Sequence, residues 1–274
     1  MRTVAVPKRW PRAKGKPTVS LPGYPAEDGI PMSATEFHGR QISTLSNQLV
    51  AFFGFDSNVY VGTDSFIYYV EGDPTKRVAP DVYVVLGVAA RPVRRSFYTW
   101  AEGAVPTVVF EFLSERTERE NRGEKLRRYL EEIGVEEVFL HQPEGSKPLE
   151  FEGWRRREGA IEEIPADERG GRYSEALGLW FVPEEQPDGV RLLRPYLPDG
   201  RPLPTLQEAQ EEAREQAMWR RLVEDWAEEV EKQAQEAERW AKEAERRARE
   251  EAQARAEAER RAREEAQARA EAER

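Results

Sequence analysis

The sequence predicts an α/β domain with a mixed sheet, followed by a long helical tail. Two observations predict this fold class. Apolar runs of strand length alternate with segments of helical periodicity in the centre of the chain. After Leu206, Pro and Gly disappear and Ala, Glu, Arg and Gln take over, which is typical of one continuous helix. We therefore divide the 274 residues into an arm (1–29), an α/β domain (30–204) and a tail (205–274).

The arm is strongly basic. Residues 1–16 hold six Lys or Arg and no acidic residue, and the Pro- and Gly-rich composition of residues 1–29 predicts disorder. Residues 205–274 hold 21 acidic and 15 basic residues. Since the whole chain carries −10, the domain between arm and tail is also acidic. An acidic domain disfavours tight, indiscriminate DNA binding, because phosphate neutralisation supplies most of the non-specific affinity.

The first predicted elements of the domain are a helix and three strands. Ser33-Ala34-Thr35-Glu36 resembles a capping box, and apolar residues follow it at helical spacing as far as Phe53. The strand candidates, separated by turn residues, are Asn58–Val61, Ser65–Val70 and Asp81–Val88.

The next segments predict a parallel strand–helix–strand unit. Thr107–Ser114 and Glu137–His141 have the composition of strands. Between them, Arg119–Ile133 carries apolar residues along one helical face, with Gly134 as its C-cap. Strands joined through a helix run parallel, so this unit adds a parallel pair to an otherwise antiparallel sheet. Short strands and turns over 149–204 predict a β-rich annex.

The tail carries a heptad seam whose two positions each recur every seven residues. These residues are Trp219, Trp226, Gln233 and Trp240, with Val223, Val230, Ala237 and Ala244 four positions after them. Beyond the seam, the unit RAREEAQARAEAER occurs twice, at 247–260 and 261–274. Two interpretations stay open: a solvated helix held by close Glu–Arg pairs, or a coiled coil through which the chain forms homo-oligomers.

Composition excludes several classes of function. The chain has no cysteine, which excludes disulfides, thiolate zinc sites and a catalytic cysteine. Its two histidines, His38 and His141, disfavour an all-histidine metal site. No run of 18 apolar residues and no apolar stretch of signal-peptide length at the N-terminus occurs, so we expect a soluble, cytoplasmic protein with no membrane partner.

Two carboxylates stand in apolar runs. Asp81 lies in PDVYVVLGV and Glu111 in TVVFEFLS, where an uncompensated charge costs several kcal/mol. Strand alternation puts Glu111 on the face of Val109 and Leu113, in a strand buried on both sides. With Asp81 on an adjacent strand, the pair could hold Mg²⁺, which prefers oxygen ligands. The alternative is structural: Asp81 caps a turn, and Glu111 pairs with a lysine or arginine of a helix.

The stretch from residue 31 to 143 resembles the restriction-endonuclease-like family within the PD-(D/E)xK nuclease superfamily. The similarity rests on YVGTDSFIYYVEGDPTKRVAPDVYVVLGV (60–88), RRSFYTWAEGAVP (94–106) and VVFEFLSERTERENRGEKLRRYLEEIGVEEVFLHQPEG (108–145). It extends over DERGGRYSEALGLWF (167–181), RLLRPYLPDGRPLPT (191–205) and the Ala/Glu/Arg tail. The resemblance implies a restriction-endonuclease-like mixed sheet flanked by helices.

The same resemblance implies a catalytic site. Asp81 corresponds to the PD aspartate and Glu111 to the second acid, and both would bind Mg²⁺ or Mn²⁺. The superfamily lysine stands two residues after the second acid, where this chain has Leu113, and Lys125 is the candidate replacement. The family usually carries Asp at the position of Asn121. Further positions at which the family tends to be polar are Glu36, His38 and Asp64.

The sequence therefore predicts a metal-dependent endonuclease that hydrolyses DNA phosphodiester bonds. The alternative is a catalytically silent nuclease fold that works as a binding or assembly module and oligomerises through its helical tail. The acidic domain, Leu113 and Asn121 favour that alternative.

Overall fold

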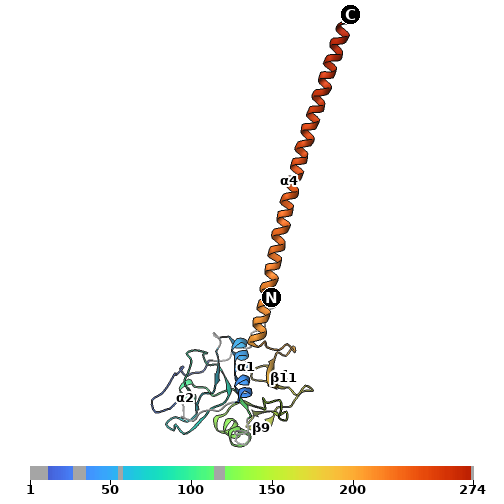
Figure 1. Ribbon diagram of the computed structural model, residues 1–274. Helices are drawn as coiled ribbons and strands as arrows, with labels where there is room; N and C mark the ends of the chain where they lie inside the picture. Colours follow the sequence, from blue (N-terminus) through green and yellow to red (C-terminus); the bar gives the residue numbers. More distant parts are fainter. Residues whose placement is uncertain (1–11, 27–34, 55–57, 114–120, 273–274) are drawn as a thin grey trace. The chain divides into compact units, whose positions relative to one another are not determined.

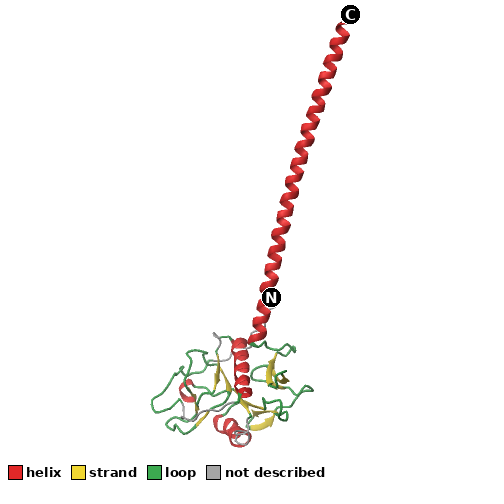
Figure 2. Ribbon diagram, in the orientation of Figure 1, coloured by secondary structure: helices red, strands yellow, loops and turns green. Residues whose placement is uncertain are grey.

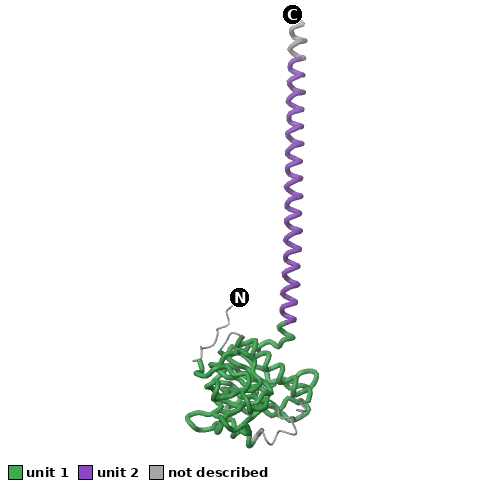
Figure 3. The backbone as a smooth tube through the Cα atoms, turned by 90° about the vertical axis from the view of Figure 1, so that its left-hand side faces the viewer, with its two compact units in different colours: residues 1–209 green, residues 210–274 purple. Residues whose placement is uncertain are grey.

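The chain forms two compact units, Met1–Ala209 and Gln210–Arg274 (Figure 3). The first holds every strand that the structure describes, and the second is helical (Figure 1, Figure 2). The computed structural model describes residues 12–26, 35–54, 58–113 and 121–272. The helical elements are α1 (Glu36–Phe53), α2 (Thr99–Glu102), the π-helical segments η1 (Asn121–Lys125) and η2 (Arg128–Ile133), and α4 (Leu206–Ala272).

The main sheet has six strands in the order β1-β4-β6-β7-β8-β9. Its strands are β1 (Val59–Thr63), β4 (Val82–Leu86), β6 (Val108–Phe112), β7 (Glu137–His141), β8 (Phe151–Arg157) and β9 (Ala160–Glu163). β6 and β7 pair in parallel, and the other neighbours pair antiparallel. The predicted mixed sheet and its parallel crossover unit are thus confirmed.

Two smaller sheets of three strands each complete the domain. One has the order β3-β2-β5, with β2 (Ile67–Tyr68), β3 (Arg77–Val78) and β5 (Phe97–Tyr98). The other has the order β10-β11-β12, with β10 (Arg172–Ser174), β11 (Leu179–Glu185) and β12 (Arg191–Tyr196).

Both faces of the main sheet are covered, which explains why its central strands are apolar throughout. One face packs against α1, through Leu45 and Leu49, and against the β10-β11-β12 sheet. The opposite face packs against η2, through Tyr129 and Leu130, and against the β3-β2-β5 sheet. The strand that carries Glu111 is therefore central, and its side chains alternate between two apolar cores.

The structure differs from the predicted elements in several places. Thr35 caps α1, because its Oγ1 accepts a hydrogen bond from the N–H of His38 at 3.3 Å, and Ser33 of the predicted capping box lies outside the described residues. The strand predicted over 65–70 is reduced to β2. The short elements β3, β5 and α2 have no predicted counterpart, because two to four residues give no periodicity. β8 and β9 extend the main sheet, so only β10–β12 form a separate annex.

Residues 12–26 lie along the domain, which differs from the disorder expected for the arm. The N–H of Lys16 donates to the carbonyl of Ala101 at 2.9 Å. The N–H of Thr18 donates to the carboxylate of Glu102 at 3.0 Å. These long-range bonds fix a backbone segment whose composition alone predicts no ordered structure.

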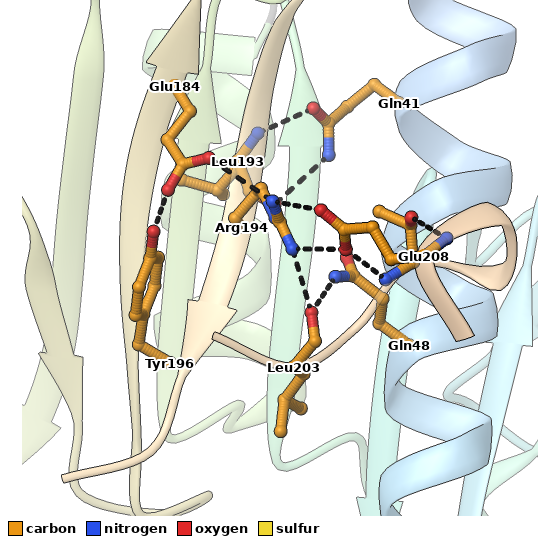
Figure 4. Close-up of polar contacts among 9 residues, drawn as sticks. Gln41, Gln48, Glu184, Leu193, Arg194, Tyr196, Leu203 and Glu208 are labelled. Atoms are coloured by element: carbon orange, nitrogen blue, oxygen red, sulfur yellow. Dashed lines mark hydrogen bonds and ion pairs between the residues drawn. The ribbon is translucent and has the colours of Figure 1, made fainter. Parts of the chain in front are cut away.

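A capping box starts α4. The Oγ1 of Thr205 accepts from the N–H of Glu208 at 3.2 Å, and the Glu208 carboxylate accepts from the N–H of Thr205 at 2.7 Å. Arg194 on β12 donates to both Glu208 oxygens, at 3.0 and 2.7 Å (Figure 4). The carbonyl of Leu203 accepts from Arg194 at 3.1 Å and from Gln48 of α1 at 2.6 Å (Figure 4). Hydrogen bonds thus join the first turn of α4 to β12. They also join Leu203, in the segment after β12, to α1.

The rest of α4 is a single helix rich in Glu and Arg pairs four residues apart, such as Glu243–Arg247 and Glu251–Arg255. This confirms the predicted long C-terminal helix. Over the described residues, no helix has the length and apolar character that crossing a membrane requires.

Candidate functional site

Asp81 and Glu111 meet at the end of the β4–β6 pairing. The antiparallel register pairs Val82 with Phe110, so the next position along the two chains sets Asp81 opposite Glu111. The backbone N–H of Phe112 donates to Oδ2 of Asp81 at 2.5 Å, which ties the two segments together just beyond that pair. The sheet therefore brings together two acids that are far apart in the sequence.

His38 adds an imidazole to Asp81. Its Nε2 lies 2.9 Å from Oδ1 of Asp81, and both side chains are almost fully covered. The cap at Thr35 places His38 in the first turn of α1, where the exposed backbone N–H groups of the helix favour a nearby anion. The two oxygens of Asp81 thus accept hydrogen bonds from α1 and from β6.

Glu111 is held by the helical segment that follows its strand. The hydroxyl of Tyr129 donates to Oε1 of Glu111 at 2.5 Å, and Nζ of Lys125 lies 3.7 Å from Oε2. Lys125 and Tyr129 are four residues apart and so share one side of the helical segment. Glu111 is 2% exposed and Lys125 is 18% exposed, so the lysine extends from the buried acid toward the surface. The segment is π-helical at both residues, a geometry that is frequent at functional sites.

The acids repel one another in this enclosed setting. Burial raises the pKa of Glu111, and the charge of Asp81 raises it further, against the opposing effects of Lys125, Tyr129 and His38. Burial alone would lower the pKa of His38, but its hydrogen bond to Asp81 and that acid's charge raise it overall. A positive charge placed between these carboxylates would relieve the repulsion.

Asp64 is a third acid beside this pair. It follows β1 with φ of +43°, a left-handed conformation that Asp adopts more readily than most residues, and its N–H donates to the carbonyl of Asp81 at 3.3 Å. Burial and then the charge of Asp81 raise the pKa of Asp64 to about 6, against a lowering by His38. The sequence placed Asp64 among the further polar positions, and the structure brings it next to Asp81.

Among the side chains that the structure describes, the other residues that the sequence singled out do not join the acids at the site. Glu36 is exposed, and among the described residues no hydrogen bond or ion pair joins it to the three acids. Leu113 is buried in the apolar core beside Tyr129. Asn121 starts η1, but its side chain is outside the described part of the chain. His141 is fully buried, and its Nε2–H donates to the carbonyl of Arg191 at 2.8 Å, so it is structural.

A local basic patch could still form from several arginines of the domain, Arg91, Arg94, Arg95, Arg116, Arg119 and Arg122, but Arg94 does not contribute its charge to one. Its guanidinium is buried in an ion pair with Glu102, at 2.5 Å, and lies over the ring of Tyr60 at 4.2 Å. Arg116 and Arg119 lie outside the described residues. Arg94 therefore serves the fold rather than a phosphate-binding surface.

Sequence reasoning missed two of the groups that hold the acids. The N–H of Phe112 is a backbone donor, which no residue pattern reveals. The hydroxyl of Tyr129 is detectable only as a polar atom on an otherwise apolar helix face, at the fourth position after Lys125.

The donors at the site match the preference of Mg²⁺. Asp81 and Glu111 offer carboxylate oxygens, each of which keeps acceptor capacity beyond its present hydrogen bond. In the described part of the chain, no three His, Asp or Glu side chains are grouped so as to hold a metal ion by themselves. Two acids are nevertheless sufficient in chemical terms, because Mg²⁺ keeps several waters and is often held by one or two carboxylates together with substrate phosphate.

No protein-family model matches the chain. No curated protein matches it either.

Proposed function

We propose that the protein is a Mg²⁺-dependent endonuclease with a restriction-endonuclease-like fold, and that it hydrolyses phosphodiester bonds in DNA. The observation that carries the proposal is the convergence of Asp81, Glu111 and Lys125: two carboxylates on adjacent strands, with an ammonium 3.7 Å from the second. The family resemblance in sequence points to the same three residues.

The chain's own groups have distinct tasks in this proposal. Asp81 and Glu111 would hold the ion, while His38 and the N–H of Phe112 fix the orientation of Asp81. A bound Mg²⁺ would offset negative charge on the phosphate and lower the pKa of the attacking water. Lys125 orients that water or stabilises the charge that develops on the phosphate. In the net reaction, water adds to phosphorus, the bond to the leaving sugar oxygen breaks, and that oxygen receives the proton.

Lys125 also accounts for the apolar residue at position 113. The superfamily lysine would stand there, but Leu113 is packed into the core. Lys125 comes from the next helical segment and reaches the same acid. A cation with a different origin in the chain can therefore serve the same acid.

A catalytically silent assembly module is the second candidate function. One observation favours it: both oxygens of Glu111 already have partners in Tyr129 and Lys125, which matches the structural interpretation of that acid. Under this alternative the helical tail carries the function.

Nicking of supercoiled plasmid DNA in Mg²⁺ or Mn²⁺ tests the proposal. We expect nicking by the wild-type chain and a loss on the order of 10²-fold or more in Asp81→Asn and Glu111→Gln. Glu131→Gln is the matched control, because Glu131 lies on η2 with a half-exposed side chain. Equal cleavage by all the variants would identify a contaminant and reject the assignment. A folded wild-type chain with no cleavage in either ion would favour the silent module.

A further inference from the structure

The tail helix presents exposed apolar side chains on an otherwise charged surface. We call Trp219, Val223, Trp226, Val230 and Trp240 the tryptophan stripe. Their exposed fractions are 63%, 60%, 68%, 44% and 69%. Clusters of large apolar side chains on a soluble chain mark an interaction surface.

The spacing of the stripe fits another copy of the same helix. Val223 and Val230 stand at the first heptad position, and Trp219, Trp226 and Trp240 stand at the fourth. This two-position seam is the geometry of a coiled coil, in which each helix packs its seam into the equivalent seam of its partner. A second copy of this chain therefore complements the stripe.

The flanks of the seam set the orientation of the two copies. From residue 229 to residue 250, the seventh heptad position is a column of acids: Glu229, Glu236, Glu243 and Glu250. From residue 227 to residue 248, the fifth position is a column of small residues: Ala227, Ala234, Ala241 and Ala248. In an antiparallel pair, seventh positions face seventh positions, which would align the two Glu columns along one flank and repel. In a parallel pair, each Glu column faces an Ala column, and the repulsion is absent.

Charge and side-chain shape also argue against a membrane surface or a third helix as the partner of the tryptophan stripe. The polar face of an interfacial membrane helix is rich in Lys and Arg, whereas residues 205–274 hold 21 acids against 15 bases. β-Branched residues at the first position, here Val223 and Val230, favour two-stranded assemblies. A third strand would also bury part of the Glu column, at a cost in desolvation.

We propose that the tail joins two copies of the chain in a parallel, in-register coiled coil. Each domain is attached at the N-terminal end of its α4, so a parallel pair holds the two domains at one end of the coiled coil. The presence of two hydrolytic centres at that end rests on the proposed function, whereas the pairing itself does not.

The cysteine-free chain allows a direct test by disulfide cross-linking. Val223→Cys and Ala244→Cys each introduce one thiol in the full-length chain, 21 residues apart on the first heptad position, which is about 32 Å along the helix. In a parallel pair, each residue lies beside its own copy, within reach of a disulfide. In an antiparallel pair, first positions lie beside fourth positions of the partner, so neither variant places its thiol beside a second copy of itself. Glu228→Cys, on the outer face of the helix, is the control.

We expect each single variant to form a disulfide dimer under mild oxidation, and Glu228→Cys to form none. The unmodified chain should have twice its 31.5 kDa mass by light scattering. The absence of a disulfide dimer in both single variants, or a solution mass of one or three chains, overturns the proposal. Neither readout depends on DNA cleavage, so an inactive but cross-linked protein would reject the hydrolytic function and leave the pairing intact.

Discussion

The hydroxyl of Tyr129 donates a 2.5 Å hydrogen bond to Oε1 of Glu111, and both groups are fully buried. The acid lies on a central strand and the phenol on the helical segment that covers it, so this bond fixes the acid against one wall of the site. It also opposes the rise in the pKa of Glu111 that burial and Asp81 cause. Tyr129 is therefore a positioning residue in the proposed function.

Tyr129→Phe should weaken the site without unfolding the domain. Loss of the hydrogen bond raises the pKa of Glu111 further, so less of the acid is ionised at neutral pH and Mg²⁺ binds more weakly, by about 10- to 100-fold. The stability cost should be about 1 kcal/mol. Calorimetric titration with Mg²⁺ and urea unfolding measure the two effects. Tyr173→Phe, on β10, is the control, and an equal loss of Mg²⁺ affinity there would contradict the positioning role.

Lys125→Met should separate catalysis from folding. Removal of the ammonium takes away the cation that lies 3.7 Å from Glu111, and we expect a loss of plasmid nicking on the order of 10²-fold. Lys125→Arg should recover part of the rate, because it keeps the charge but changes the geometry. Arg127→Met removes an exposed cation from the same segment and should nick normally. If Lys125→Met loses stability but retains its nicking rate, the ion pair is structural.

His141 should make stability depend on pH in a defined window. Burial lowers the pKa of His141 from 6.5 to about 4, so the unfolded chain takes up the proton at a higher pH than the folded one. The contribution of neutral His141 to the free energy of unfolding is fully present above pH 6.5 and is lost as the pH falls toward 4. This contribution amounts to about 3 kcal/mol. His141→Gln keeps a donor for the carbonyl of Arg191 but does not titrate. The difference in unfolding free energy between wild type and variant should shrink across this window, and a constant difference would contradict the assignment.

Sequence reasoning reached the parts of the site that depend on strand periodicity. The position of Glu111 on the face of Val109 and Leu113 follows from alternation, and the structure confirms it. The contact between His38 and Asp81 could not be predicted, because it depends on how α1 packs across the sheet. Such packing is set by side chains distant in sequence, and no local pattern encodes it.

The arm shows the same limit of sequence reasoning, because the structure is more ordered there than the sequence predicts. Its Pro, Gly and Lys content predicts disorder, since too little apolar surface is available to offset the entropy of ordering. Residues 12–26 are ordered instead by backbone bonds to groups on the domain, including the buried acid Glu102. Composition reports what a segment can bury by itself, and it does not report donors and acceptors that another segment offers.

Glu102 should control whether the arm stays on the domain. Its carboxylate accepts from Arg94 at 2.5 and 3.0 Å and from the N–H of Thr18 at 3.0 Å. Glu102→Gln removes the charge that pairs with buried Arg94, at a cost of about 3–5 kcal/mol, and should speed tryptic cleavage after Arg12 and Lys14. Thr18→Pro removes the N–H donor, together with the hydroxyl that donates to the carbonyl of Lys16, and leaves the ion pair intact, so it should speed the same cleavages with a smaller fall in thermal stability. Mass spectrometry of the timed digest measures both. If Arg12 and Lys14 are cut as fast in the wild type as in Thr18→Pro, the bond from Thr18 does not hold the arm.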